Sequence, residues 1–289
     1  MRVLLTGGTG FIGSRLRGRL VGAGHTVTVV SRGAAGDVTW APEAIRTAVA
    51  ASDAVVHLAG ENLFDRRWSA RQKHTLHASR VDTTRLLAEA VAEAGCRAFI
   101  TGSAIGFYGT SAERRFKVGD PPGGDFLGRL CRDWEAARQP AIDAGVRTAT
   151  VRTGVVQGLG GGALQKMLLP FKLGVGGPLG DGRQWVSWIH MEDLLAMLAW
   201  LLENENTHGE YNGTAPNPVS NRDLSKALGR VLSRPAIMSL PGFVLRMALG
   251  DVAELVLDGQ HVTPGRALAE GFSFQFPDIE PALRNLLRG

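Results

Sequence analysis

A glycine-rich segment near the N-terminus is the part of this sequence best suited to bind a charged ligand. Thr6–Gly13 reads Thr-Gly-Gly-Thr-Gly-Phe-Ile-Gly and fits both G-x-G-x-x-G and G-x-x-G-x-x-G. Such a turn needs glycine because a pyrophosphate must lie against bare backbone and because the turn uses positive φ angles. The helix that opens after it offers free N–H groups and the positive end of its dipole. We therefore predict a dinucleotide site, with a plain glycine-rich turn as the alternative. The residues assigned to this turn are Gly7, Thr9, Gly10, Phe11, Ile12 and Gly13.

The end of the second predicted strand indicates which dinucleotide binds. An NAD site usually places Asp or Glu there for the ribose hydroxyls, whereas this sequence has Val30-Ser31-Arg32. Ser31 can hydrogen-bond a 2′-phosphate, and Arg32 can pair with it and stack on adenine. These two residues favour NADP over NAD. The alternative is that Arg32 is a solvated surface residue.

Short apolar runs alternate with longer amphipathic ones through the first half of the chain, and they must position this loop. We predict strands at Arg2–Leu5, His25–Val30, Asp53–Leu58, Arg97–Thr101 and Arg147–Val151, and helices at Phe11–Ala23, Ser69–Ala94 and Phe126–Ala144. This alternation predicts a parallel sheet with helices on both faces. Right-handed crossovers make it a doubly wound, Rossmann-type α/β fold. We assign residues 1–156 to an NADP-binding Rossmann domain, to which later segments can return.

The pattern changes in the second half. Residues 157–184 are dense in glycine, and we predict a long loop there that is functional or mobile. Helices are predicted at Met191–Glu203 and Asn221–Leu232, and the tail has two helical stretches that begin at proline and an aromatic, strand-like piece at Phe272–Phe276. We assign residues 157–289 to a smaller substrate-side lobe that includes a C-terminal module over 235–289.

The composition bears on partners and location. The chain has 289 residues, 44% of them hydrophobic, which is ample for a buried core and too apolar for a disordered chain. Its net charge of +5 comes from scattered basic residues, so we expect no nucleic-acid partner. No apolar run approaches the roughly 18 residues of a membrane span, so we expect no membrane partner. Cys96 and Cys131 cannot form a disulfide framework and fit a reducing cytoplasm. No His, Cys and Asp cluster has metal-ligand spacing, so we predict no metal site.

Several stretches together resemble a known family. Three of them, Thr6–Gly13, Asp53–Gly60 and Ser103…Tyr108-Gly109, resemble extended short-chain dehydrogenases/reductases, the nucleotide-sugar epimerase and dehydratase group. More specific stretches are Leu58–Asn62, Arg67-Trp68, Ser79–Leu87, Trp134-Glu135, Arg152–Val156, Gly176–Gly182, Trp188–His190, Gly259-Gln260…Pro264…Gly271-Phe272 and Phe276-Pro277. They resemble the atypical branch of epimerase family proteins, often labelled cell-division inhibitors or nucleoside-diphosphate-sugar epimerases. The resemblance spans essentially the whole chain, including a C-terminal module of undefined function.

The resemblance implies that NADP(H) binds in extended form across the strand ends. Leu58, Ala59 and Gly60 would pass beneath the adenosine and its ribose, and we add Glu61, which directly follows them. Arg80 would reach back toward the cofactor from the long helix. Three residues would line the nicotinamide side: Thr101, Gly102 and Val156. At the family level a homodimer through the long helices is also expected.

The resemblance further implies a catalytic pair that this sequence lacks. The family uses a Tyr as acid/base in a Tyr-x-x-x-Lys arrangement, where the Lys lowers the pKa of the Tyr and holds the nicotinamide ribose. The chain has two tyrosines, Tyr108 and Tyr211, and neither begins such a motif. With Glu135 as the anchor, the Tyr position holds Leu127 and the Lys position holds Cys131. Neither side chain can shuttle a proton as the missing pair does.

Two hydroxyls are the best replacements. Ser103 falls at a strand end where the family keeps a Ser or Thr that hydrogen-bonds the substrate oxygen. Tyr108 lies in a glycine-containing turn and could contact the substrate or donate a proton, with a packed aromatic as the alternative. We assign these two residues as catalytic.

Other candidates have strong structural alternatives. Glu61 could act as a base or make a structural hydrogen bond, and His190 could act near neutral pH or be a buried structural histidine. Lys166 and Lys172 could reach an anionic substrate or be solvated on the surface. Cys131 has no evident base beside it.

These observations lead to three functional hypotheses. The first is an NADP(H)-dependent oxidoreductase or epimerase-like enzyme that acts on a small carbonyl or carbinol without the usual pair. The second is a non-catalytic NADP-binding regulatory protein related to cell division. The third is a lyase or cyclase on the same fold.

Overall fold

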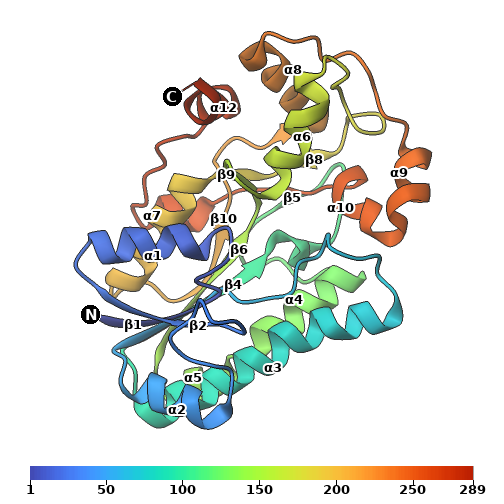
Figure 1. Cartoon of the computed structure of the whole chain (residues 1–289). Coiled ribbons are helices and arrows are strands. Elements are labelled where there is room, and N and C mark those ends of the chain that lie inside the picture. Colours follow the sequence, from blue (N-terminus) through green and yellow to red (C-terminus); the bar gives the residue numbers. More distant parts are fainter. Residues whose placement is uncertain (289) are drawn as a thin grey trace.

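A parallel sheet of six strands lies at the centre of the computed structural model, which describes residues 1–288 (Figure 1). In spatial order the strands are β10 (Gly209–Gly213), β6 (Arg147–Thr153), β4 (Ala98–Ala104), β3 (Ala54–His57), β1 (Arg2–Thr6) and β2 (Thr26–Val30). Every neighbouring pair is parallel. The strand order reverses between β1 and β3, which is the switch point where open α/β sheets bind ligands. The predicted Rossmann-type fold is confirmed.

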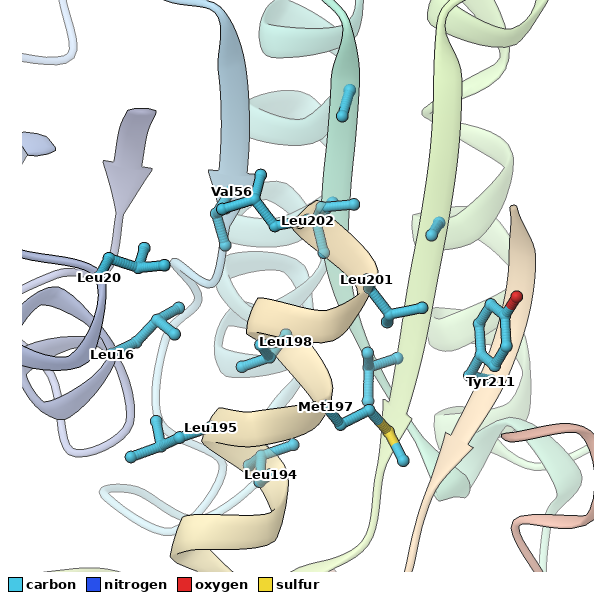
Figure 2. Close-up of a cluster of buried hydrophobic side chains, with 14 of the residues drawn as sticks. Leu16, Leu20, Val56, Leu194, Leu195, Met197, Leu198, Leu201, Leu202 and Tyr211 are labelled. Atoms are coloured by element: carbon cyan, nitrogen blue, oxygen red, sulfur yellow. The ribbon is translucent and has the colours of Figure 1, made fainter. Parts of the chain in front are cut away.

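Helices cover both faces of this sheet. α1 (Gly13–Gly22) and α7 (Met191–Glu203) pack on one face, where Leu5 belongs to a first core. Figure 2 shows Leu16 and Leu198 of the same core. α2 (Pro42–Ala50), α3 (Ala70–Ala94) and α5 (Gln139–Asp143) pack on the other face, against Leu4 in a second core. Successive strand residues point to opposite faces, so the apolar strands supply both cores at once.

Two predictions about helices were wrong. The helix predicted at Phe126–Ala144 is two helices, α4 (Phe126–Ala136) and α5. Pro140, in the first turn of α5, has no N–H to continue the hydrogen-bond ladder of α4. The second error concerns the loop predicted at 157–184, which contains α6 (Gly162–Lys172). Its buried side chains Leu164, Leu168 and Phe171 recur at helical spacing, and they explain the helix that the surrounding glycines obscured.

The second half of the chain contributes to the central sheet and also builds its own core. β10 and α7 lie beyond residue 156, yet they complete the sheet and one of its faces. A third core lies between α6, α8 (Asn221–Leu232) and α12 (Ile279–Arg288). Two short sheets join it to the centre: β7 (Val155–Gln157) with β9 (Trp188–His190), and β8 (Trp185–Val186) with β11 (Val219–Ser220).

The C-terminal module lies across the ends of the strands. Besides α12, it comprises α9 (Gly242–Leu249), η2 (Gly250–Ala253), α10 (Glu254–Leu257), β12 (His261–Val262) and α11 (Gly265–Ala269). α9 and α11 each follow a proline, as predicted. β12 pairs in parallel with β5 (Arg115–Phe116), which follows η1 (Ile105–Tyr108).

The aromatic piece predicted as strand-like forms no strand. In Phe272–Phe276 the N–H groups of Gln275 and Phe276 donate instead to the buried carboxylate of Asp193, at 2.8 and 3.0 Å. The side-chain carboxylate thus replaces a neighbouring strand. None of the helices within residues 1–288 has the length and apolar character to cross a membrane.

Candidate dinucleotide site and the polar cluster beside it

The glycine-rich turn follows β1 at the switch point of the sheet and is closed tightly against backbone. Gly7 has a φ of +71°, and a Cβ there would lie 2.8 Å from the carbonyl oxygen of Leu58. A Cβ at Gly13 would lie 2.2 Å from the carbonyl oxygen of Gly7. Inside this turn the N–H of Gly10 donates to the same oxygen, at 2.9 Å. Only glycine therefore fits at Gly7 and Gly13.

The start of α1 fits a bound phosphate. No side chain caps the helix and no acidic residue lies in its first turn, so its N–H groups and dipole face no competing negative charge from within the helix. Thr9 and Gly10 are exposed, whereas Phe11 and Ile12 are half-buried. The exposed N–H groups at this helix start could therefore hold the pyrophosphate of a dinucleotide.

Phe11 connects the turn to the start of α6. Its ring fills the space where a Cβ at Gly161 would lie, at 2.5 Å. Arg15 donates to the carbonyl oxygens of Phe11 and Leu159, both at 2.7 Å, and its guanidinium lies 4.9 Å from the Phe11 ring centroid. The glycines that follow β7 thus let α6 begin directly above the turn.

The residues after β2 present a cation without a ribose-binding acid. Arg32 has an 82% exposed side chain, and its Nη1 lies 3.3 Å from Oε2 of Glu61. Ser31 accepts a hydrogen bond from the N–H of Gly33 at 3.2 Å. Asp37, the nearest acid along the chain after β2, accepts from the N–H of Val29 at 2.8 Å. The guanidinium of Arg32 is therefore the charge that a 2′-phosphate would meet.

Hydrogen bonds to buried side chains fix the segment after β3. The N–H of Ala59 donates to the hydroxyl of Thr6 at 3.3 Å, and that hydroxyl lies 2.6 Å from Nδ1 of His57. Burial, followed by the charge of Arg80, lowers the pKa of His57 to about 3. His57 is therefore neutral at physiological pH.

The side chain of Arg80 extends from α3 toward the segment after β3, where it donates a hydrogen bond to the backbone. Its Nη2 donates to the carbonyl oxygen of Glu61 at 2.8 Å, and its Cζ lies 3.2 Å from where a Cβ at Gly60 would be. Arg80 thus fixes the path of Gly60 and Glu61. The segment Leu58–Glu61 lies beside the glycine-rich turn, as the contact of Gly7 with Leu58 shows.

The three residues predicted for the nicotinamide side lie on two sheets. Thr101 is buried in β4 and its hydroxyl lies 2.6 Å from that of Thr150. Gly102 follows it, and a Cβ built there would meet no atom closer than 3.6 Å. Val156 is half-buried in β7 and pairs with Ile189 of β9. The Thr101 hydroxyl is engaged within the protein, so this wall offers mainly backbone and apolar surface.

A buried network, which we call the polar cluster, comprises Ser103, Glu135, Arg152, Tyr108 and Asn212. Ser103 and Asn212 are both register partners of Arg152, so three neighbouring strands place them in one row. Ser103 Oγ donates to Oε1 of Glu135 at 2.7 Å. Arg152 donates to Glu135 through Nε and Nη2, both at 2.8 Å. The cluster therefore holds a charged pair that is almost closed to solvent.

Packing and charge hold Arg152 in place. Its side chain is 5% exposed, and its guanidinium lies 3.5 Å from the centroid of the Phe107 ring. Burial alone would lower the pKa of Arg152, but the hydrogen bonds and negative charge of Glu135 outweigh burial and raise it. Arg152 is therefore permanently charged.

Tyr108 belongs to the same network and is 4% exposed. Its hydroxyl donates to Oδ1 of Asn212 at 2.7 Å and accepts from Nη1 of Arg152 at 2.9 Å. Its ring stacks on Phe116, with centroids 5.2 Å apart. Burial raises the pKa of Tyr108 despite the nearby Arg152. This geometry fits the packed aromatic better than the proton donor.

The positions of the missing catalytic pair are closed to proton transfer. Leu127 packs against Gly106, where a Cβ would lie 3.2 Å from its own Cβ. Cys131 is buried, and burial together with the charge of Glu135 raises the pKa of its thiol to about 12. The thiol therefore stays protonated at neutral pH. Tyr211, the other tyrosine, is buried in the first core (Figure 2).

The other candidates have contacts that fit structural roles. His190 caps α7 by accepting from the N–H of Glu192 at 3.1 Å, and it stacks on Phe276 with centroids 3.9 Å apart. Burial lowers the pKa of His190 to about 4. Lys166 lies 4.6 Å from the ring centroid of Phe64, and Lys172 is exposed. Within residues 1–288 no group of His, Cys, Asp and Glu is arranged to hold a metal ion.

Sequence reasoning missed three members of the polar cluster. Glu135 entered only as an alignment anchor, and Arg152 only as part of a stretch that carries a resemblance. Asn212 lies on the edge strand β10, which was not predicted. The available signal was positional, because charged and amide side chains at the ends of adjacent parallel strands meet at one edge of the sheet.

Two family models match the chain. The NAD dependent epimerase/dehydratase family matches residues 3–212, and a domain of unknown function, DUF1731, matches residues 240–286.

Proteins similar over their full length carry the name epimerase family protein. SDR39U1 of Mus musculus is 42% identical over 295 residues, covering 99% of this chain and 100% of the relative. MT2273 of Mycobacterium tuberculosis is 40% identical over 288 residues, covering 97% and 96%.

Solved structures are similar to the whole chain. The crystal structure of human SDR39U1 isoform 2 with NADPH has a TM-score of 0.92 at 40% identity and covers 100% of both chains. The UDP-glucose 4-epimerase of Thermotoga maritima has a TM-score of 0.82 at 19% identity, covering 100% of this chain and 98% of the other. At that identity the second structure shows a shared fold.

Proposed function

The chain belongs to the NAD dependent epimerase/dehydratase family, and from this membership we propose an NADP(H)-dependent oxidoreductase or epimerase-like enzyme. Its substrate is a small carbonyl or carbinol. The relative human SDR39U1 was crystallised with NADPH, which supports the cofactor assignment.

One arrangement carries the proposal, namely a bare phosphate turn beside a strand end that offers a cation and no free acid. Gly7 and Gly13 leave the backbone open to a pyrophosphate, and the uncapped start of α1 supplies its N–H groups. Arg32 stands where an NAD site places a carboxylate, while Asp37 is turned toward Val29. A 2′-phosphate therefore gains a partner where a free ribose hydroxyl would not.

The chemistry at the far end of the site depends on few side chains. Bound NADP(H) supplies or accepts a hydride at its nicotinamide. Ser103, at the end of β4, is the side chain we assign to the substrate oxygen. Without a Tyr-x-x-x-Lys pair the site lacks general acid–base assistance of about 10²–10⁴-fold. We therefore expect slow turnover, or an activated substrate.

The test follows the nicotinamide absorbance band while the protein meets NADPH with a panel of carbonyls, and NADP⁺ with the matched carbinols. We expect slow, substrate-dependent change, and Ser103→Ala should reduce the rate with the carbinols at least tenfold. Ser225→Ala is the matched control, because Ser225 is also buried but lies in α8, away from the polar cluster. Full activity in Ser103→Ala would remove Ser103 from the mechanism.

A non-catalytic NADP-binding regulatory protein is the second candidate, and one observation favours it. The hydroxyl protons of Ser103 and Tyr108 are both donated within the polar cluster. Tight NADPH binding with no hydride transfer to any member of the panel would favour this function, or a lyase or cyclase reaction, over the first.

The remaining assignments rest on physical grounds. We propose a cytoplasmic location, since Cys96 and Cys131 are buried free thiols. A small molecule is the proposed partner, and nucleic acid and membranes are not. The homodimer through the long helices remains a prediction.

A further inference from the structure

We propose that Ser103 recognises a carbinol hydroxyl in preference to a carbonyl oxygen. This inference rests on the proposed function only in taking Ser103 as the contact to the substrate oxygen. The question is whether Ser103 offers a ligand its proton or a lone pair.

The count of protons in the polar cluster carries the argument. A carboxylate only accepts hydrogen bonds, and a serine hydroxyl has one proton and two lone pairs. The carboxylate of Glu135 accepts a hydrogen bond from Ser103 Oγ at 2.7 Å and two from N–H groups of Arg152 at 2.8 Å. Because two donors of one guanidinium grip this carboxylate, it is ionised, and Ser103 must be the donor in its hydrogen bond. Ser103 therefore presents only lone pairs to a ligand.

The other hydroxyl of the cluster supplies no replacement proton. The hydroxyl of Tyr108 donates its proton to Oδ1 of Asn212 and accepts a hydrogen bond from Nη1 of Arg152. Outside the cluster, the thiol of buried Cys131 stays protonated and hydrogen-bonds with Ser103, so its proton goes to Ser103 itself and one lone pair of Ser103 is left for a ligand. A carbonyl oxygen placed against Ser103 would thus meet a lone pair.

A carbinol satisfies the same geometry. Its O–H donates to Ser103 Oγ, whose own proton remains on the side of Glu135. For a carbonyl to bind equally well, Ser103 would have to rotate its proton away from a carboxylate that is 8% exposed. Losing a hydrogen bond to a buried charge makes that rotation unfavourable by about tenfold or more.

The experiment measures binding without turnover, in complexes that cannot react. The carbinol 1-phenylethanol is titrated against protein loaded with NADPH, and acetophenone against protein loaded with NADP⁺. Cyclohexanol and cyclohexanone form a second pair. Ligand-detected NMR gives a dissociation constant for each, and the ratio of carbinol to ketone affinity is compared between variants, which cancels the effect of the cofactor's redox state.

Three variants separate the possibilities. Ser103→Ala removes the acceptor and leaves the Glu135–Arg152 pair intact, so carbinol affinity should fall at least tenfold while ketone affinity is unchanged. Glu135→Gln replaces an obligatory acceptor with an amide that can also donate, so the ratio should fall toward that of Ser103→Ala. Glu270→Gln is the matched control, since Glu270 likewise accepts one hydroxyl, from Tyr211, and one arginine, Arg266. It should keep the wild-type ratio.

Several results would overturn the proposal. These are binding of ketones alone, equal loss of both ligands in Ser103→Ala, a wild-type ratio in a folded Glu135→Gln, and no carbinol bound by the wild-type protein. No hydride moves in these complexes. The binding ratio can therefore be measured even if the absorbance assay finds no hydride transfer, and the two proposals can fail separately. If Glu135→Gln does not fold, Ser103→Ala alone decides.

Discussion

The glycine-rich turn after β1 and the polar cluster at the ends of β4, β6 and β10 lie at the same edge of one sheet but are built in opposite ways. The turn consists of backbone, and it can close tightly because Gly7 and Gly13 have no Cβ. The polar cluster consists of side chains from three strands, one 3-10 helix and α4, and hydrogen bonds between these side chains hold them in place. The turn should therefore fail when an atom is added, and the cluster when one partner is removed.

Removing the cation of the polar cluster should have the largest effect. Arg152→Met keeps the length of the side chain but leaves the Glu135 carboxylate buried without its counter-charge. The expected loss in the free energy of unfolding is about 3–5 kcal/mol, measured by urea denaturation. Arg230→Met, which breaks the exposed pair with Glu280, is the control and should cost about 1 kcal/mol or less.

A double variant tests whether charge is the cause. Replacing Glu135 with Leu together with Arg152→Met removes both charges, so much of the lost stability should return. If the single Arg152→Met variant were as stable as the Arg230→Met control, the cluster would not depend on its charged pair and the contrast with the turn would fail.

Adding one methyl group to the turn should have the next largest effect. In Gly13→Ala the new Cβ meets the carbonyl oxygen of Gly7 at 2.2 Å, so the turn must distort. We expect a cost of about 1–3 kcal/mol, expressed as a loss of roughly 30-fold in NADPH affinity, measured by cofactor fluorescence. Gly18→Ala, in the same helix with nothing within 4 Å of its Cβ, should bind NADPH like the wild type. Equal affinity in Gly13→Ala would show that the turn does not hold the phosphates.

The smallest expected effect concerns the choice between cofactors. Arg32→Ala should weaken NADPH binding by about tenfold, because an exposed guanidinium contributes one charge-assisted contact to the 2′-phosphate. NADH, which lacks that phosphate, should bind as before. Arg46→Ala, which removes another exposed arginine paired with glutamate, should change neither. Equal weakening of both cofactors would exclude Arg32 as the discriminating residue.

The sequence predicts the turn well because its determinants are local. A strand, a set of spaced glycines and a helix start occupy one short stretch, and Arg32 follows the next strand at a fixed place. The predicted strands agree for the same reason, since each is a short apolar run. α6 was missed because its three buried apolar residues lie among glycines that read as a loop.

The polar cluster was only partly predictable. Ser103 and Tyr108 stood out as hydroxyls, but their partners depend on the register of three strands and on one turn of α4. Glu135 and Arg152, taken singly, look like surface charges, and their burial follows only from their pairing. Which way the proton of Ser103 points is a property of the assembled network.

The contact between β5 and β12 has a consequence for how the chain is made. β12 lies near the C-terminus, and the amide of Asn212 donates to the carbonyl oxygen of Thr263, just beyond it, at 3.0 Å. On the ribosome, the strands that carry Ser103, Arg152 and Asn212 emerge long before this last cover does. In a nascent chain Asn212 of the polar cluster therefore lacks this partner until translation is nearly finished, and the long-range contact between β5 and β12 forms late in folding.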